Sequence, residues 1–148
     1  MSNLNIVREK FNCVEIVNDN KIIVHSNLTD VLEFLKNTPE FNFDMLTTII
    51  ASDKIEKIEL IYQLFSTTSN ETLDVYYHAP GIAPTVIDIY NSAYFDECEI
   101  YDLFGVNFEG NKNLKRLLLP SSWIGHPLLK NYKNQDERLA WNDWYNKS

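Results

Sequence analysis

The sequence predicts an α+β fold: a small antiparallel sheet backed by helices, followed by an extended, irregular C-terminal arm. Three observations lead to this prediction. Apolar and polar side chains alternate in successive segments after residue 44, which is the period of half-buried strands. Apolar residues recur at helical spacing on either side of those segments. Beyond Phe108 neither period is sustained.

The N-terminal part is expected to begin with a short helix within the first ten residues, followed by a strand at Lys21–His25. Ser26 and Asn27 come next, and both residue types are favoured at helix N-caps because their side chains accept a backbone N–H. A helix of about ten residues is expected after them. It ends near Pro39, and its apolar positions are Leu28, Val31, Leu32 and Leu35.

The sheet is predicted from three further strands, Met45–Asp53, Lys57–Ser66 and Thr72–His78. A run of turn-forming residues, 66–71, separates the last two. Consecutive strands with short connections pair antiparallel, so we expect an antiparallel sheet.

A third helix is predicted to start after Asn91 or Ser92 and to end at Gly105, which suits the left-handed C-cap position. Cys98 falls on the apolar stripe of this helix. A thiol in apolar surroundings has a raised pKa and is inert, so we interpret Cys98 as a core residue.

The composition limits the classes of function. At 148 residues the chain fits one domain with a real core. Two cysteines and three isolated histidines do not provide the ligand sets of clusters or zinc sites. A net charge of −8 argues against nucleic-acid binding. No apolar run approaches the roughly 20 residues of a membrane span, and a reducing cytoplasm is the simplest compartment.

The charge is unevenly distributed along the chain. Residues 1–108 carry 17 acidic and 6 basic side chains, whereas residues 109–148 carry 4 and 7. We therefore divide the chain into an α+β core domain, 1–110, and a docking arm, 111–148. The arm either folds back on its own acidic domain or is steered to a separate subunit.

Three carboxylates of the third predicted helix are candidate site residues: Glu97, Glu99 and Asp102. Paired carboxylates can act as an acid and a base. No nucleophile, oxyanion donor or metal-ligand set accompanies them, so ion pairs, within the chain or at an interface, are the preferred interpretation. A solvated face is the other alternative.

The arm contains candidate anchors. Trp123, Trp141 and Trp144 are large aromatic side chains of the kind that anchors interfaces, although packing against their own domain is the alternative. His126 stands between Gly125 and Pro127, a context that suits a docking turn better than proton transfer.

The stretch Phe95–Tyr132 resembles the 30 kDa subunit of the respiratory NADH–quinone oxidoreductase (complex I) and its relatives in membrane-bound, energy-converting nickel–iron hydrogenases. The resemblance rests on three motifs in the family's order: Glu-x-Glu-x-Tyr-Asp-Leu-Phe-Gly-Val at 97–106, Leu-Leu-Leu-Pro at 117–120 and Gly-His-Pro-Leu-x-Lys at 125–130.

The resemblance implies a non-catalytic scaffold subunit without a cofactor of its own. Iron–sulfur clusters, flavin or nickel–iron are expected only in partner subunits. The expected partners are the hydrogenase-like large subunit and the iron–sulfur small subunit, with membrane contact only through the complex, on the cytoplasmic face. The residues expected at these interfaces are Glu97, Glu99, Tyr101, Asp102, Arg116, Trp123, His126, Lys130, Trp141 and Trp144.

Two alternatives from other classes remain open. One is a stand-alone acidic adaptor that binds a protein or peptide, and the other is a small carboxylate hydrolase. Within the family, the electron acceptor is either quinone or protons, and no motif here distinguishes them.

Overall fold

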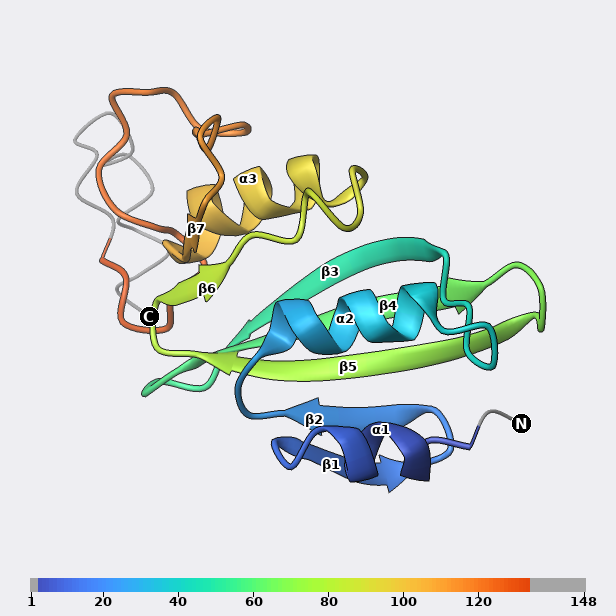
Figure 1. Cartoon of the computed structure of the whole chain (residues 1–148). Helices are drawn as coiled ribbons and strands as arrows, with labels where there is room; N and C mark the ends of the chain where they lie inside the picture. The colour runs from blue at the N-terminus through green and yellow to red at the C-terminus, as the bar shows by residue number, and fades with distance from the viewer. Residues whose placement is uncertain (1–2, 134–148) are drawn as a thin grey trace.

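Five strands form the main sheet of the computed structural model, which describes residues 3–133. Their order across the sheet is β1 (Val14–Asn18), β2 (Lys21–Val24), β5 (Glu71–Ala79), β4 (Ile58–Ser66) and β3 (Met45–Asp53). Helices α1 (Asn5–Lys10) and α2 (Leu28–Asn37) lie on one face of this sheet (Figure 1). The predicted α+β class is therefore confirmed, and the three predicted long strands lie within one residue of their expected bounds.

The prediction of a purely antiparallel sheet is wrong at one pair. β3, β4 and β5 are antiparallel neighbours, but β2 pairs with β5 in parallel, with Ile22 opposite Val75. The rule for consecutive strands does not apply here, because α2 and two strands separate β2 from β5 and carry the chain back across the sheet. β1 was not predicted at all; it completes a short hairpin with β2.

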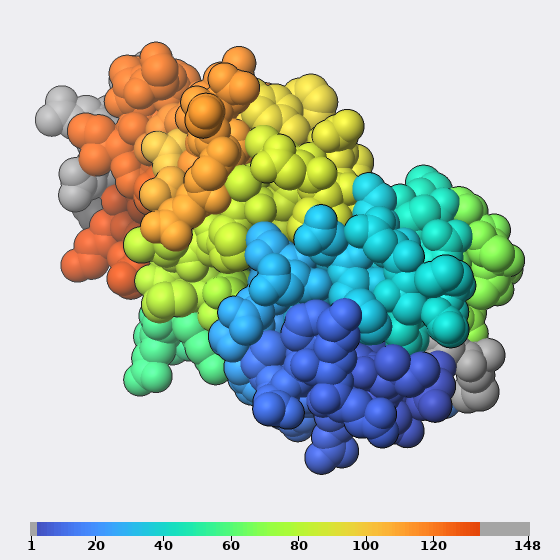
Figure 2. Space-filling view, in the orientation of Figure 1, coloured from blue at the N-terminus to red at the C-terminus, as the bar shows by residue number. Residues whose placement is uncertain are grey.

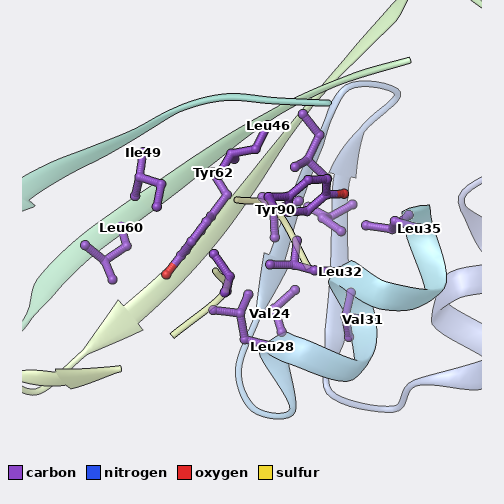
Figure 3. Close-up of a cluster of buried hydrophobic side chains, with 14 of the residues drawn as sticks. Val24, Leu28, Val31, Leu32, Leu35, Leu46, Ile49, Leu60, Tyr62 and Tyr90 are labelled. Carbon is purple, nitrogen blue, oxygen red and sulfur yellow. The ribbon is translucent and has the colours of Figure 1, made fainter. Parts of the chain in front are cut away.

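The core lies between α2 and the sheet (Figure 3). β4 buries every second residue, as its alternation predicts, and Tyr62 at its centre is fully buried. The four apolar residues predicted on one face of α2 are all buried. Each such side chain contributes roughly 1.5–3 kcal/mol by leaving water, so these two elements account for much of the stability of the domain.

Helix α3 (Ala93–Phe104) ends as predicted, with Gly105 in the left-handed conformation at φ +74° and its N–H bonded to the Tyr101 carbonyl. The N-cap positions were predicted correctly, but the expected capping hydrogen bonds are not formed. Asn27 and Ser92 occupy the N-cap positions of α2 and α3, but neither makes a capping hydrogen bond. The Ser92 hydroxyl instead donates to the Leu46 carbonyl at 3.1 Å, because α3 packs against β3.

A small parallel pair flanks α3 on either side in the sequence: β6 (Ile82–Pro84) and β7 (Asn107–Glu109). Neither strand is predicted from the sequence. After β7 the arm has turns but no helix or strand as far as Lys133. The arm packs along α3 at one end of the molecule (Figure 1).

The predictions for Trp141 and Trp144 lie outside the described residues. The division into 1–110 and 111–148 stays a prediction. None of the helices among residues 3–133 has the length and hydropathy to span a membrane.

Candidate functional site

Helix α3 packs along the outer edge of β3, and this packing positions the residues of the candidate site. The Asp96 carboxylate accepts the Ile49 N–H at 2.8 Å, and Ser92 bonds the Leu46 carbonyl. These contacts satisfy backbone groups that an edge strand otherwise leaves open to another chain. The following residues of α3 are thereby oriented toward β6 and the arm.

Glu97 is fully buried and joins three segments. Its carboxylate accepts hydrogen bonds from the Thr85 hydroxyl (2.7 Å), the Val86 N–H (2.8 Å) and the Asn111 amide (2.9 Å). Burial raises the pKa of Glu97, and the three hydrogen bonds oppose that shift without cancelling it. Glu97 therefore connects α3 to the segment after β6 and to the first residue of the arm.

Asp102, further along the same helix, is also fully buried and binds the arm directly. One carboxylate oxygen lies 2.8 Å from the Arg116 guanidinium. The other accepts three successive backbone N–H groups, those of residues 117–119, at 3.0, 2.7 and 2.9 Å. Successive amides of this kind form an anion-binding concavity. Burial acts to raise the pKa of Asp102, but the bonds from Arg116 and the three amides outweigh it, so the pKa is lowered.

His126 packs against the C-terminal end of α3. Its Nδ1 lies 2.9 Å from the Asp102 carbonyl oxygen, and a carbonyl only accepts, so Nδ1 carries the proton. The ring fits against Gly105, where an added Cβ would lie 2.6 Å from the imidazole Cδ2. The Tyr101 ring makes an edge contact at 6.0 Å between centroids. This is the packing and hydrogen-bonding role that the sequence favours for His126.

Two further hydrogen bonds hold the end of the arm. The Leu128 N–H donates to the Leu103 carbonyl at 3.0 Å. The Lys130 N–H donates to the Asp53 carboxylate at 2.8 Å, and this bond, with one from the Ile55 N–H, lowers the pKa of Asp53. Asp53 is the last residue of β3, so the arm is joined to the sheet as well as to α3.

Three apolar side chains of the arm are exposed at this junction. Leu118, Ile124 and Leu128 expose 61%, 76% and 50% of their surface. Trp123 lies between them in the sequence and is half-buried, with an indole N–H that is enclosed but has no hydrogen-bond acceptor among the described residues. Side chains of this kind, held in place by polar contacts beneath them, are typical of a protein-binding surface.

The predicted site residues fall into three groups. Asp102 and Arg116 form an ion pair within the chain, which is the intrachain alternative that the sequence left open, and Glu97 is bonded within the chain by neutral donors. Glu99 and Lys130 are exposed, and Tyr101, Trp123 and His126 are half-buried; their interface role stays a prediction. Trp141 and Trp144 lie outside the described residues.

The sequence gives no indication of Asp53, Thr85 or Asn111 as site residues. Their partners lie 77, 12 and 14 positions away, and no local periodicity connects them. A single Asp at the end of a strand also occurs in ordinary turns. Among residues 3–133, no cluster of three or more His, Cys, Asp or Glu side chains is placed to hold a metal ion.

Comparison with known proteins agrees with the motif resemblance. The family described as the 30 kDa subunit of respiratory-chain NADH dehydrogenase matches residues 22–138. An NADH-quinone oxidoreductase subunit of Rickettsia bellii is 34% identical over 110 residues, which cover 71% of this chain and 56% of that protein. The corresponding subunit of Geobacter sulfurreducens is 32% identical over 120 residues, covering 76% and 73%. The chain thus spans about half the length of the Rickettsia relative.

A solved structure has the same fold. It is a chain of the membrane-bound sulfane sulfur reductase, an archaeal respiratory membrane complex, with a TM-score of 0.65 and 24% sequence identity. The superposition covers 97% of this chain and 89% of the other. At this identity the similarity concerns the fold alone.

Proposed function

Since the chain belongs to the family of the 30 kDa subunit of respiratory-chain NADH dehydrogenase, we propose that it is a scaffold subunit in the peripheral arm of a complex I-like or membrane-bound hydrogenase-type oxidoreductase. It does no redox chemistry of its own. It holds the subunits that carry the redox centres, excludes water between them and keeps the distances between those centres constant.

The observation that carries this proposal is the construction of the arm. Buried polar contacts at Asp102 and Glu97 fix the backbone of the arm, while the side chains of Leu118, Ile124 and Leu128 remain exposed. A surface fixed in this way loses little conformational entropy on binding, which favours tight association. A partner that covers these three side chains would also remove their apolar area from water.

The partners proposed are the hydrogenase-like large subunit and the iron–sulfur small subunit of the same complex. Their contacts would place the chain at the periphery of the membrane, on the cytoplasmic face, without a contact to lipid of its own. The low number of cysteines, two in the whole chain, supports a subunit without a cluster.

The test is affinity purification of the tagged full-length protein from its native cells in mild detergent. Partners are identified by mass spectrometry, and iron, nickel and flavin are assayed in the eluate. Iron together with a hydrogenase-like large subunit is expected. Nickel would favour proton reduction over quinone reduction. A metal-free monomer would contradict the proposal and favour the adaptor alternative.

Removal of residues 120–148 tests the role of the arm. The truncated chain loses the contacts of His126, Leu128 and Lys130 but keeps the whole sheet and the three amides at Asp102. We expect it to fold and to be absent from the purified complex. A truncated chain that still assembles would show that the arm is dispensable.

A further inference from the structure

The tip of the β3–β4 hairpin carries an isoleucine in an unfavourable position. Ile55 has φ +76°, the left-handed region that β-branched residues avoid. Its side chain is 80% exposed, so it contributes nothing to the core. Glycine or asparagine would occupy this conformation with less strain. A strained, exposed, apolar residue indicates a role outside the fold of the domain.

The hairpin tip lies beside the end of the described part of the arm, although 75 positions separate Ile55 from Lys130 in the sequence. Asp53 accepts the Ile55 N–H through one oxygen (2.6 Å) and the Lys130 N–H through the other (2.8 Å). A groove of about 280 Å³ runs between the two segments, and its walls include Ile55, Lys57, Gly81, His126, Leu129 and Asn131. Figure 2 shows the teal-green hairpin tip projecting at the same end of the molecule as the red end of the described arm.

This end of the molecule is rich in lysine, unlike the rest of the core domain. Lys54 and Lys57 on the hairpin and Lys130 and Lys133 on the arm are all exposed. The nearby carboxylates are Asp53, Glu56 and Glu59. Asp53 is bonded to two backbone N–H groups, and Glu59 is paired with Lys54 and His78. The four lysines outnumber the three carboxylates, so this end of the molecule carries a small positive formal charge in a core domain that is otherwise acidic.

We propose that the hairpin tip and the end of the arm form one docking face for a protein partner whose surface is apolar at its centre and acidic at its rim. Ile55 is the central anchor, and the four lysines meet the rim. This inference rests on the proposed function and adds a second segment, distant in sequence, to the interface made by the arm. Apolar centres with charged rims are the usual anatomy of such interfaces.

The test compares two variants of the full-length tagged protein, each purified from its native cells. Ile55→Asn removes the anchor and suits the left-handed conformation. Val17→Asn is the matched control, because Val17 is 47% exposed on β1, at the opposite edge of the sheet. The measured quantity is the amount of co-purified partner protein per mole of tagged chain.

We expect Ile55→Asn to reduce the co-purified partner about tenfold, as loss of an interface anchor does, and Val17→Asn to leave it within about twofold of the wild type. If Ile55→Asn recovers as much partner protein as the wild type, the proposed docking face is wrong. The proposed function would still stand in that case, because the wild type assembles with its partners. If the wild type recovers no partner, both proposals fail.

Size-exclusion chromatography of the purified protein tests whether a second copy of the chain, rather than a different protein, binds the docking face. A concentration-dependent dimer that Ile55→Asn abolishes would overturn the proposed heterologous partner. We expect Ile55→Asn and the wild type to elute identically. Thermal unfolding of both proteins completes the comparison, because a variant that unfolds no earlier than the wild type has lost partner binding for a reason other than folding.

Discussion

The Asp102 carboxylate and the Arg116 guanidinium lie 2.8 Å apart, with Asp102 fully buried near the end of α3 and Arg116 only 15% exposed on the arm. A second Nη of Arg116 donates to the Gly125 carbonyl at 2.9 Å. One guanidinium thus joins the helix, the beginning of the arm and the turn that places His126.

Replacement of Asp102 by Asn should destabilise the protein by about 3 kcal/mol, because it leaves the largely enclosed Arg116 charge without its counter-ion and weakens three charge-assisted bonds to backbone amides. Urea unfolding of the full-length variant measures this effect. Glu99→Gln, an exposed change on the same helix, should alter stability by less than about 0.5 kcal/mol. An Asp102→Asn variant as stable as Glu99→Gln would mean that the ion pair is not formed.

The wild type and Glu97→Gln should differ in how their stability depends on pH. Its folded pKa is raised by burial, so its favourable contribution is complete below the unfolded value of about 4.3 and is lost as the pH rises through the folded pKa. The stability of the wild type relative to Glu97→Gln should therefore fall as the pH rises above about 4. Urea unfolding at several pH values gives this difference, in which other titrating groups cancel. A difference that rises with pH would show that the hydrogen bonds dominate over burial.

Alanine substitutions at Gly105 and Gly81 distinguish the cost of backbone strain from the cost of a steric conflict with a neighbouring side chain. Both have positive φ, +74° and +104°, so alanine costs about 1 kcal/mol at either position. Only at Gly105 does the new Cβ also meet a ring, that of His126 at 2.6 Å. We expect Gly105→Ala to cost about 3 kcal/mol and to expose the arm to trypsin at Lys130. Equal effects of the two substitutions would exclude a tight contact between Gly105 and His126.

Ile55→Asn should stabilise the isolated chain by about 1 kcal/mol, because asparagine tolerates the left-handed conformation that isoleucine avoids. Thermal unfolding of the full-length protein detects the change. A lower melting temperature for Ile55→Asn would mean that the isoleucine supports the hairpin rather than a partner.

Much of the fold was predictable because local periodicity decides it. β4 alternates along its whole length, and α2 carries its four apolar residues on one face; each element buries what its own pattern presents. The cap at Gly105 and the buried thiol of Cys98 follow from the same local rules. β1 escaped prediction because its pattern is broken by a bulge between Ile16 and Asn18.

The candidate site was predictable only in part. The residues Glu97, Asp102, Arg116 and His126 were identified from the sequence, but their partners were not. A carboxylate on a helix has the same sequence signature whether it faces solvent, a partner or the interior. The three amides that surround Asp102 belong to backbone groups, which carry no residue-specific signal at all.

The sequence by itself determined the helices α2 and α3 and the three long strands, since each depends on the pattern of residues within one element. It also determined the charge difference between core and arm, which depends on composition alone. The tertiary structure decided the parallel β2–β5 pair, the burial of Glu97 and Asp102, and the meeting of Ile55 with the arm through Asp53. The physical reason is that these features arise between segments distant in sequence, where packing and burial, rather than local propensity, select which polar groups become partners.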